Sequence, residues 1–558
     1  MSTSQSRRND SPSPPLQRGK ACISCRRRKM RCDGLRPTCT QCLRGDRAID
    51  CEYTDGSQRS RTLALEEDVA RLQARVRELE GSETTTPSVT LHDPYGQTRQ
   101  PTTAHYSLSP GSSGTTRHGP DYDPESFSDL QYLIDTLAPY ALDLGIFLSL
   151  PRLRAQPGSI SPALRSALIL CSFHLTRPSG PEQAVSAEAL VSRLLHTLVD
   201  ALVAANPRLG PQFYMQTLQA EVLLAYHLLR MGRVSTAQSH ANAAMSLAIC
   251  LGLHLSSGDA PPAGLFDFLA ASLPRLPRPG DAIEEQERVD AWWTIHSLVK
   301  SAETIHAGPP VVSSTVNITA PWPGTTRGDN SVAPGGALRN TVTQFLVSQN
   351  FGIQGETPFG LQARASVLLG EAHSAAAAYH RDPSISQSND FRSRFATLDN
   401  LIQNFFNSVL HLATSFRSSG SGGTYNSRQI LLTVNLAALA QITLHRPFAS
   451  SHTPSNRRCV DSAIRAVHAL NGLNDLKIMN PICVASWGVF FSALQNELHR
   501  LRSRSQQRHG PVSAAQGPNE VGEADIVNAL RSLASFSRAL SGQYPLQMTI
   551  RAKLEAAI

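Results

Sequence analysis

Six cysteines between positions 22 and 51 restrict the fold of this chain more than any other feature of its sequence. Their pattern is Cys-x2-Cys-x6-Cys-x6-Cys-x2-Cys-x8-Cys, formed by Cys22, Cys25, Cys32, Cys39, Cys42 and Cys51. Each Cys-x2-Cys pair can direct two thiolates at one ion, and six thiolates can complete two tetrahedral Zn²⁺ sites if two sulfurs are shared. The alternative is three disulfides, which require an oxidising compartment. Residues 1–21 lack the apolar centre of a secretory signal, so we expect reduced thiols and two zinc ions per chain.

The segment that contains these cysteines, CISCRRRKMRCDGLRPTCTQCLRGDRAIDC, resembles the fungal Zn2Cys6 binuclear zinc-cluster DNA-binding domain. All six ligand positions match, and so do the RRRK-x-RCD and RP-x-C features. The resemblance implies that Cys22 and Cys39 bridge the two zinc ions. It also implies that Cys25 and Cys32 complete one zinc site, and that Cys42 and Cys51 complete the other.

The positive charge of the chain is concentrated around this cluster. Residues 1–60 hold 13 Lys and Arg against 6 Asp and Glu, which accounts for almost all of the net charge of +8. Such a module should attract double-stranded DNA by counterion release. The predicted DNA contacts are Arg26, Arg27, Arg28, Lys29, Arg31 and Arg44.

Five of these residues lie in the gap between Cys25 and Cys32, which we expect the metal to fold into a short helix. The resemblance implies that Arg28 and Lys29 reach base edges of a CGG triplet in the major groove, where Arg or Lys to guanine is the commonest specific contact. Arg26 and Arg44 are assigned to phosphates. The alternative for the run RRRKMR is a nuclear-import signal or a solvated basic segment, and import to the nucleus can use the same residues.

A heptad pattern follows in residues 61–80. Its seam consists of Leu65, Val69, Leu72, Val76 and Leu79, with valine at the a positions and leucine at the d positions. This choice favours a parallel two-stranded coiled coil, and arginine and glutamate at the g and e positions favour in-register pairing. Three heptads are marginal alone, so the alternative is one amphipathic helix packed on the rest of the protein. We predict a homodimer.

From about residue 125 onward, apolar residues recur at three- and four-residue steps, which predicts helices. Residues 232–254 (GRVSTAQSHANAAMSLAICLGLH) and 284–300 (EEQERVDAWWTIHSLVK) resemble the fungal-specific transcription factor domain, or middle homology region. Trp292 and Trp293 are interpreted as core anchors. The four cysteines outside the cluster, Cys171, Cys250, Cys459 and Cys483, are expected to be buried. No apolar run reaches membrane-spanning length, and the longest, residues 430–444, is expected to be a core helix.

The predicted fold is mostly α. Its predicted organisation is a disordered basic tail (1–17), the Zn2Cys6 domain (18–52), a linker (53–60), the coiled coil (61–80), a disordered spacer (81–124), an all-α regulatory domain (125–502), and a flexible segment with a C-terminal helix (503–558). The sequence contains none of the common hydrolase, metalloprotease or nucleotide-binding motifs, so we expect no enzyme.

These features predict a nuclear, sequence-specific transcription factor that acts on RNA polymerase II transcription with the transcription machinery, and that has a possible small-molecule effector of unknown identity. The alternative is a helical effector-binding or scaffold protein whose zinc cluster binds DNA only weakly.

Overall fold

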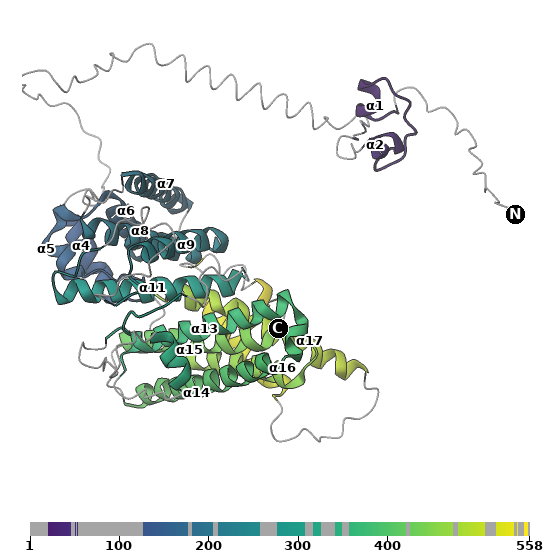
Figure 1. Cartoon of the computed structure of the whole chain (residues 1–558). Helices are drawn as coiled ribbons and strands as arrows, with labels where there is room; N and C mark the ends of the chain where they lie inside the picture. The colour runs from purple at the N-terminus through teal and green to yellow at the C-terminus, as the bar shows by residue number, and fades with distance from the viewer. Residues whose placement is uncertain are drawn as a thin grey trace, which may run out of the picture. The chain divides into compact units, whose positions relative to one another are not determined.

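A computed structural model describes most of the chain outside the predicted tail, linker, coiled coil and spacer. The described residues are 20–45, 51, 53, 127–176, 181–204, 210–256, 276–306, 308, 316–324, 341–348, 356–419, 424–471, 478–507, 521–540, 544 and 552–555. The predicted dimerisation residues of segment 61–80 lie outside them. The chain divides into two compact units, Met1–Thr116 and Arg117–Ile558 (Figure 1). The described residues form helices and no strand, which confirms the mostly α prediction.

The first unit is small and is built around sulfur. Its two described helices have five residues each, α1 (Ile23–Arg27) and α2 (Thr40–Arg44). Five buried cysteines form its core, with Ala21, Cys51 and Tyr53 partly buried against them. Helices this short are not stable by themselves in water, so the contacts among the cysteines have to hold them.

The second unit begins with a group of helices that contains α8. They are α4 (Phe127–Leu137), α5 (Leu150–Ala155), α6 (Pro162–Thr176), α7 (Pro181–Ala204), α8 (Pro211–Arg230) and α9 (Val234–Cys250). Every residue of α8 from Tyr214 to Arg230 is buried, because α6, α7 and α9 all pack against it. A helix that is covered on all sides has no need of a polar face.

A second group of helices contains α15 (Thr424–His445). Its members are α13 (Pro358–Arg381), α14 (Asn389–Ser419), α16 (Thr453–Leu470), α17 (Pro481–Gln507) and α18 (Glu523–Leu540). The α13–α15 pair has the largest interface of the unit. Residues 430–444 lie inside α15, which confirms the predicted core helix. Polar side chains within it find partners, since Asn435 Nδ2 lies 2.7 Å from Cys483 Sγ and Thr433 Oγ1 donates to the Gln429 carbonyl at 3.0 Å.

Helix α11 (Ala282–His306) connects the two groups, because it packs against α9 on one side and α13 on the other. Figure 1 shows it running between them. Trp292 and Trp293 on this helix are both 0% exposed, which confirms their prediction as core anchors. The Trp293 indole donates to the Pro321 carbonyl at 2.7 Å and stacks on Trp322 at 4.5 Å between ring centroids.

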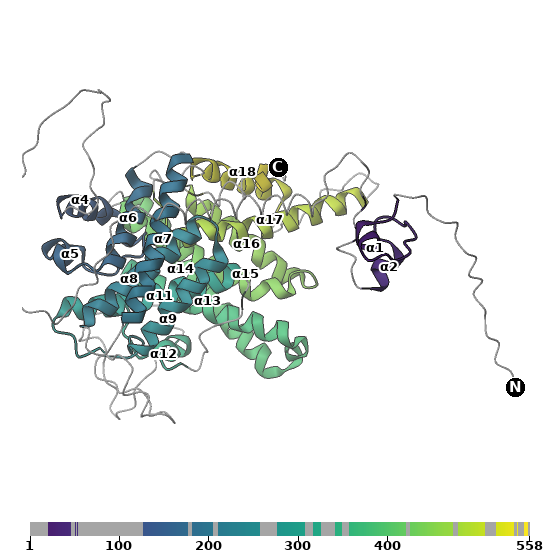
Figure 2. The same cartoon turned by 90° about the horizontal axis from the view of Figure 1, so that it is seen from above.

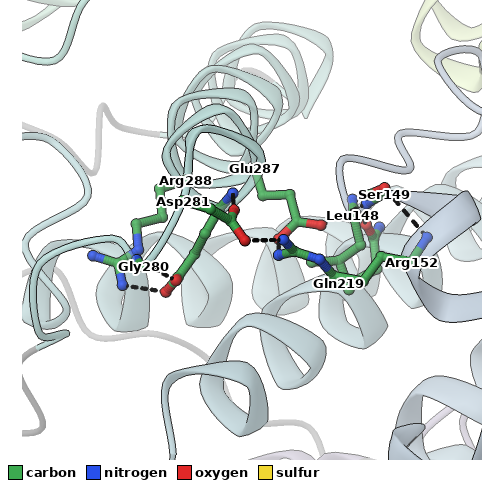
Figure 3. Close-up of polar contacts among 9 residues, drawn as sticks. Leu148, Ser149, Arg152, Gln219, Gly280, Asp281, Glu287 and Arg288 are labelled. Atoms are coloured by element: carbon green, nitrogen blue, oxygen red, sulfur yellow. Dashed lines mark hydrogen bonds and ion pairs between the residues drawn. The ribbon is translucent and has the colours of Figure 1, made fainter. Parts of the chain in front are cut away.

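The acidic residues that precede the tryptophans fasten a loop to the start of α11. Glu287 accepts a hydrogen bond from the Ser149 amide at 2.8 Å, and Arg152 of α5 pairs with Asp281 and lies 3.6 Å from Glu287 (Figure 3). On α8, Gln219 Oε1 accepts from the amide of Leu148 at 3.2 Å. These contacts explain Glu287 of the motif as a structural residue of the helical unit.

Some expectations need correction. Cys171, Cys459 and Cys483 are buried as predicted, but Cys250 is exposed, because it occupies the last position of α9. The predicted domain boundaries stay predictions. Residue 502 lies inside α17, and α18 lies beside α17 (Figure 2) and adds Ile526 to the same core. Among the described helices, none combines the length and the apolar character that a membrane crossing needs.

Candidate metal centre and nucleic-acid interface

The two Cys-x2-Cys pairs fold into the same local structure. Cys22 is the N-cap of α1 with φ −61° and ψ 155°, and Cys39 is the N-cap of α2 with φ −71° and ψ 151°. Each N-cap sulfur accepts a hydrogen bond from the amide three residues later, from Cys25 to Cys22 and from Cys42 to Cys39, both at 3.4 Å. The sequence therefore builds two equivalent halves, and each presents two sulfurs from one helical turn.

Four sulfurs from these halves lie within 4.8 Å of one another, those of Cys22, Cys25, Cys39 and Cys42. The Sγ–Sγ distances are 3.8 Å for Cys22–Cys39, 3.8 Å for Cys22–Cys42 and 3.6 Å for Cys25–Cys39. A tetrahedral Zn–S site with bonds of about 2.3 Å has sulfurs about 3.8 Å apart, whereas a disulfide bond is about 2.05 Å long. All six cysteines of the cluster are free thiols, so these spacings fit shared zinc ligands.

The remaining two cysteines reach the same cluster from the connecting segments. Cys32 groups with Cys39 and Asp33 as a second set of potential ligands. The Cys51 sulfur accepts a hydrogen bond from the Cys39 amide at 3.2 Å, and its thiol also interacts with the thiols of Cys22 and Cys42. All six predicted ligands therefore converge.

The environment of the sulfurs also fits a bound cation. Burial raises the pKa of the Cys25 thiol to about 12 and raises that of Cys22 as well. Zinc binds thiolates and supplies the positive charge that makes them stable in such a core.

Asp33 fastens the two halves together through hydrogen bonds. Its two carboxylate oxygens lie 3.2 and 3.1 Å from the Thr40 amide at the start of α2, and the Leu35 amide donates to it at 3.4 Å. Hydrogen bonding from Thr40 holds the pKa of Asp33 below its usual value. Sequence reasoning assigned no role to Asp33, although its place directly after Cys32 was a usable signal.

The basic residues lie where α1 ends, and this helix is shorter than predicted. It covers residues 23–27 instead of filling the gap between Cys25 and Cys32. Lys29 takes a left-handed conformation with φ 53°. The Lys29 amide donates to the Arg26 carbonyl at 3.2 Å and the Met30 amide to the Cys25 carbonyl at 2.9 Å, which is a Schellman motif. A position usually occupied by glycine therefore carries a lysine.

All predicted DNA contacts are on the surface of the cluster. Each of the six is exposed: Arg26, Arg27, Arg28, Lys29, Arg31 and Arg44. Arg26 donates to the Ala21 carbonyl at 3.2 Å, which directs this side chain back along the start of the cluster. The arrangement places a layer of positive charge outside a core of sulfur.

Comparison with known proteins agrees with this geometry. Residues 20–60 match the model of the fungal Zn(2)-Cys(6) binuclear cluster domain. This segment is a binuclear zinc-cluster domain. A domain of this family binds two zinc ions, and the converging cysteines of the present cluster can hold them.

Several curated proteins are similar to this part of the chain. Transcription factor FBD3 of Gibberella moniliformis is 40% identical over 62 residues, which are 11% of this chain and 8% of that protein. Transcriptional activator protein acu-15 of Neurospora crassa is 42% identical over 65 residues, 11% of this chain and 7% of that protein. The citrinin biosynthesis transcriptional activator ctnR of Monascus purpureus is 39% identical over 75 residues, 12% and 13% of the two chains. The chain therefore spans only a small part of the relatives it matches. No solved structure matches.

Proposed function

We propose that this protein is a nuclear, sequence-specific DNA-binding transcription factor that regulates RNA polymerase II transcription. The observation that carries the proposal is the cluster of six cysteines, five of them buried, with an exposed run of cations at the end of α1. The similar proteins are named as transcription factors and activators. The proposal involves no enzymatic activity.

In the proposed cluster, Cys22 and Cys39 are the bridging ligands. Cys25 and Cys32 complete one zinc site, and Cys42 and Cys51 complete the other. Support comes from the equivalent N-cap positions of the two bridging residues and from the contact between Cys39 and Cys51. The zinc ions, when bound, cross-link the halves and supply folding free energy. The cysteines orient α1 and α2 so that the basic residues form one surface.

The proposed DNA contact divides the cations by role. Arg28 and Lys29 lie at the turn that ends α1, and we assign them to the guanine edges of a CGG-type triplet in the major groove. Arg26 and Arg44 are assigned to phosphates, which position the domain without reading the sequence. Arg27 and Arg31 add charge to the same surface and strengthen binding through counterion release.

We further propose that the protein binds DNA as a homodimer through residues 61–80. The linker of residues 53–60 spans at most about 29 Å when extended, so the two triplets should lie within roughly two turns of the duplex. The helical unit is proposed as a regulatory domain of the middle homology type. In this proposal it contacts the transcription machinery and responds to a small-molecule effector of unknown identity.

Binding-site selection with the full-length protein tests the proposed function. The wild type should hold two zinc ions per chain and enrich DNA with paired CGG triplets. Cys39→Ser should lose the bridging sulfur, hold less than two zinc ions and enrich no sequence. Cys250→Ser, which changes an exposed cysteine of α9 outside the cluster, is the matched control and should behave as the wild type. A wild-type protein that holds zinc and enriches no sequence would instead support a helical effector-binding or scaffold protein.

A further inference from the structure

Tyr53, two residues beyond the last cysteine of the cluster, contacts Cys32 and the loop that follows it. Its hydroxyl donates a hydrogen bond to the Leu35 carbonyl at 2.9 Å and lies 3.8 Å from Cys32 Sγ. The guanidinium of Arg36 lies over the Tyr53 ring, 4.9 Å from its centroid. The segment that carries the final ligand, Cys51, therefore packs against the loop that follows Cys32 and is hydrogen-bonded to it.

This loop, residues 33–38, connects the two halves of the cluster. Asp33 holds its beginning to α2, and Tyr53 holds its middle through Leu35 and Arg36. Cys51 in turn accepts from the Cys39 amide at 3.2 Å. A single tyrosine thus joins the side of the cluster with Cys39 and Cys51 to the side with Cys32.

We propose that Tyr53 is a positioning residue of the zinc cluster, which fixes the Cys32 ligand and holds Arg36 in place for a phosphate of the DNA backbone. The single proton of the phenol goes to the Leu35 carbonyl. Tyr53 therefore acts on Cys32 through the loop that follows this ligand and through the contact of its oxygen with the sulfur, and contacts outside a metal site orient the ligands and slow metal loss. The part that concerns zinc stands apart from DNA binding, whereas the part that concerns Arg36 rests on the proposed function.

Because its guanidinium lies over the Tyr53 ring, the Arg36 side chain has a restricted orientation. Arginine pays little further entropy on binding a phosphate when its planar guanidinium is already oriented. Arg36 is exposed, and the attraction between a guanidinium and an aromatic face holds it over the Tyr53 ring. Arg36 therefore adds a phosphate contact to those assigned from the sequence, and this contact depends on Tyr53.

Full-length variants separate the two roles of Tyr53. Tyr53→Phe keeps the ring under Arg36 and removes the hydroxyl, whereas Tyr53→Leu removes both. Zinc release to a chromogenic chelator and the absorption spectrum of the cobalt-substituted protein report on the metal sites. The salt dependence of DNA affinity reports on Arg36. Tyr132→Phe, at an exposed tyrosine of α4, is the matched control.

We expect Tyr53→Phe to release one of the two zinc ions roughly tenfold faster and to change the cobalt–thiolate absorption, with the salt slope unchanged. Tyr53→Leu should show the same faster release and also lose about one unit of salt slope, as Arg36→Gln does in the wild type. Adding Arg36→Gln to Tyr53→Leu should then change little, because the phosphate contact is already lost.

Two results would overturn the proposal. One is zinc release from Tyr53→Phe at the wild-type rate, and the other is an equal loss of salt slope from Arg36→Gln with and without Tyr53→Leu. A wild type that holds two zinc ions and binds no DNA would overturn the proposed function instead, and zinc release would still decide the role of Tyr53 toward Cys32.

Discussion

Lys29 occupies a position where the backbone and the side chain have opposite requirements. Its φ of 53° lies in the left-handed region. This conformation raises the energy of a residue with a Cβ atom by roughly 1–2 kcal/mol, and glycine does not have this cost. Glycine loses about 0.5–1 kcal/mol more conformational entropy on folding. Lys29→Gly should therefore stabilise the zinc-bound cluster by about 0.5–1 kcal/mol, while it removes the cation assigned to base reading.

The loss of that contact should weaken specific DNA binding by about 1–3 kcal/mol, which is roughly 5- to 150-fold in affinity. Lys29→Ala should show the same loss of affinity without the gain in stability, because alanine keeps the cost of the left-handed conformation. Fluorescence anisotropy with a selected site measures the affinity, and the chelator concentration that removes half of the zinc measures the stability of the cluster.

Gly34→Ala serves as the control, since Gly34 also has a left-handed backbone with φ 72°. This change should weaken zinc retention and leave every cation in place. The reasoning is refuted if Lys29→Gly weakens zinc retention, or if both Lys29 variants bind the selected site as tightly as the wild type.

Two further predictions concern the dimer and the helical unit. Leu72→Pro should break both the helix and the seam of segment 61–80, so sedimentation should find monomers, whereas Gln73→Ala should leave the dimer intact; a wild type that is already monomeric contradicts the seam. Burial raises the pKa of Asp290 to about 7, although Gln286 donates to it. The native state then binds a proton that the unfolded state has released, so this residue's contribution to stability falls as pH rises from about 4 to 7. Urea unfolding should find that Asp290→Asn stabilises the protein relative to the wild type, and that this gain is larger at pH 8 than at pH 5 by on the order of 2 kcal/mol. A pH-independent difference would contradict the assignment.

The cysteine spacing was sufficient to predict the first unit because metal ligation is a local property. Two sulfurs separated by two residues reach one ion whatever surrounds them, and Cys22 and Cys39 do occupy equivalent N-cap positions. The helical character of the second unit was predictable for a similar reason, since a period of 3.6 residues needs no knowledge of the partner helix. Trp292 and Trp293 followed from size and hydrophobicity.

Other features depend on contacts between distant segments, which a single sequence does not encode visibly. Arg428 pairs with Asp143 at 2.8 Å although 285 positions separate them. Cys250 was expected to be buried by its apolar neighbours, yet its exposure depends on where α9 ends and which of its faces packs on α8 and α11. The early end of α1 follows from a local contact instead, the turn that brings the Met30 amide onto the Cys25 carbonyl.

The sequence by itself determined which atoms can bind zinc, where positive charge accumulates and that the large unit is helical, because these properties belong to residue types and short spacings. Only the tertiary structure decided that Asp33 and Tyr53 hold the cluster from outside it. It also decided that Arg36 lies on an aromatic ring and that Lys29 is left-handed. The physical reason is that hydrogen bonds, stacking and backbone conformation in the connecting segments are set by which groups the two zinc-binding halves bring within a few ångströms of one another.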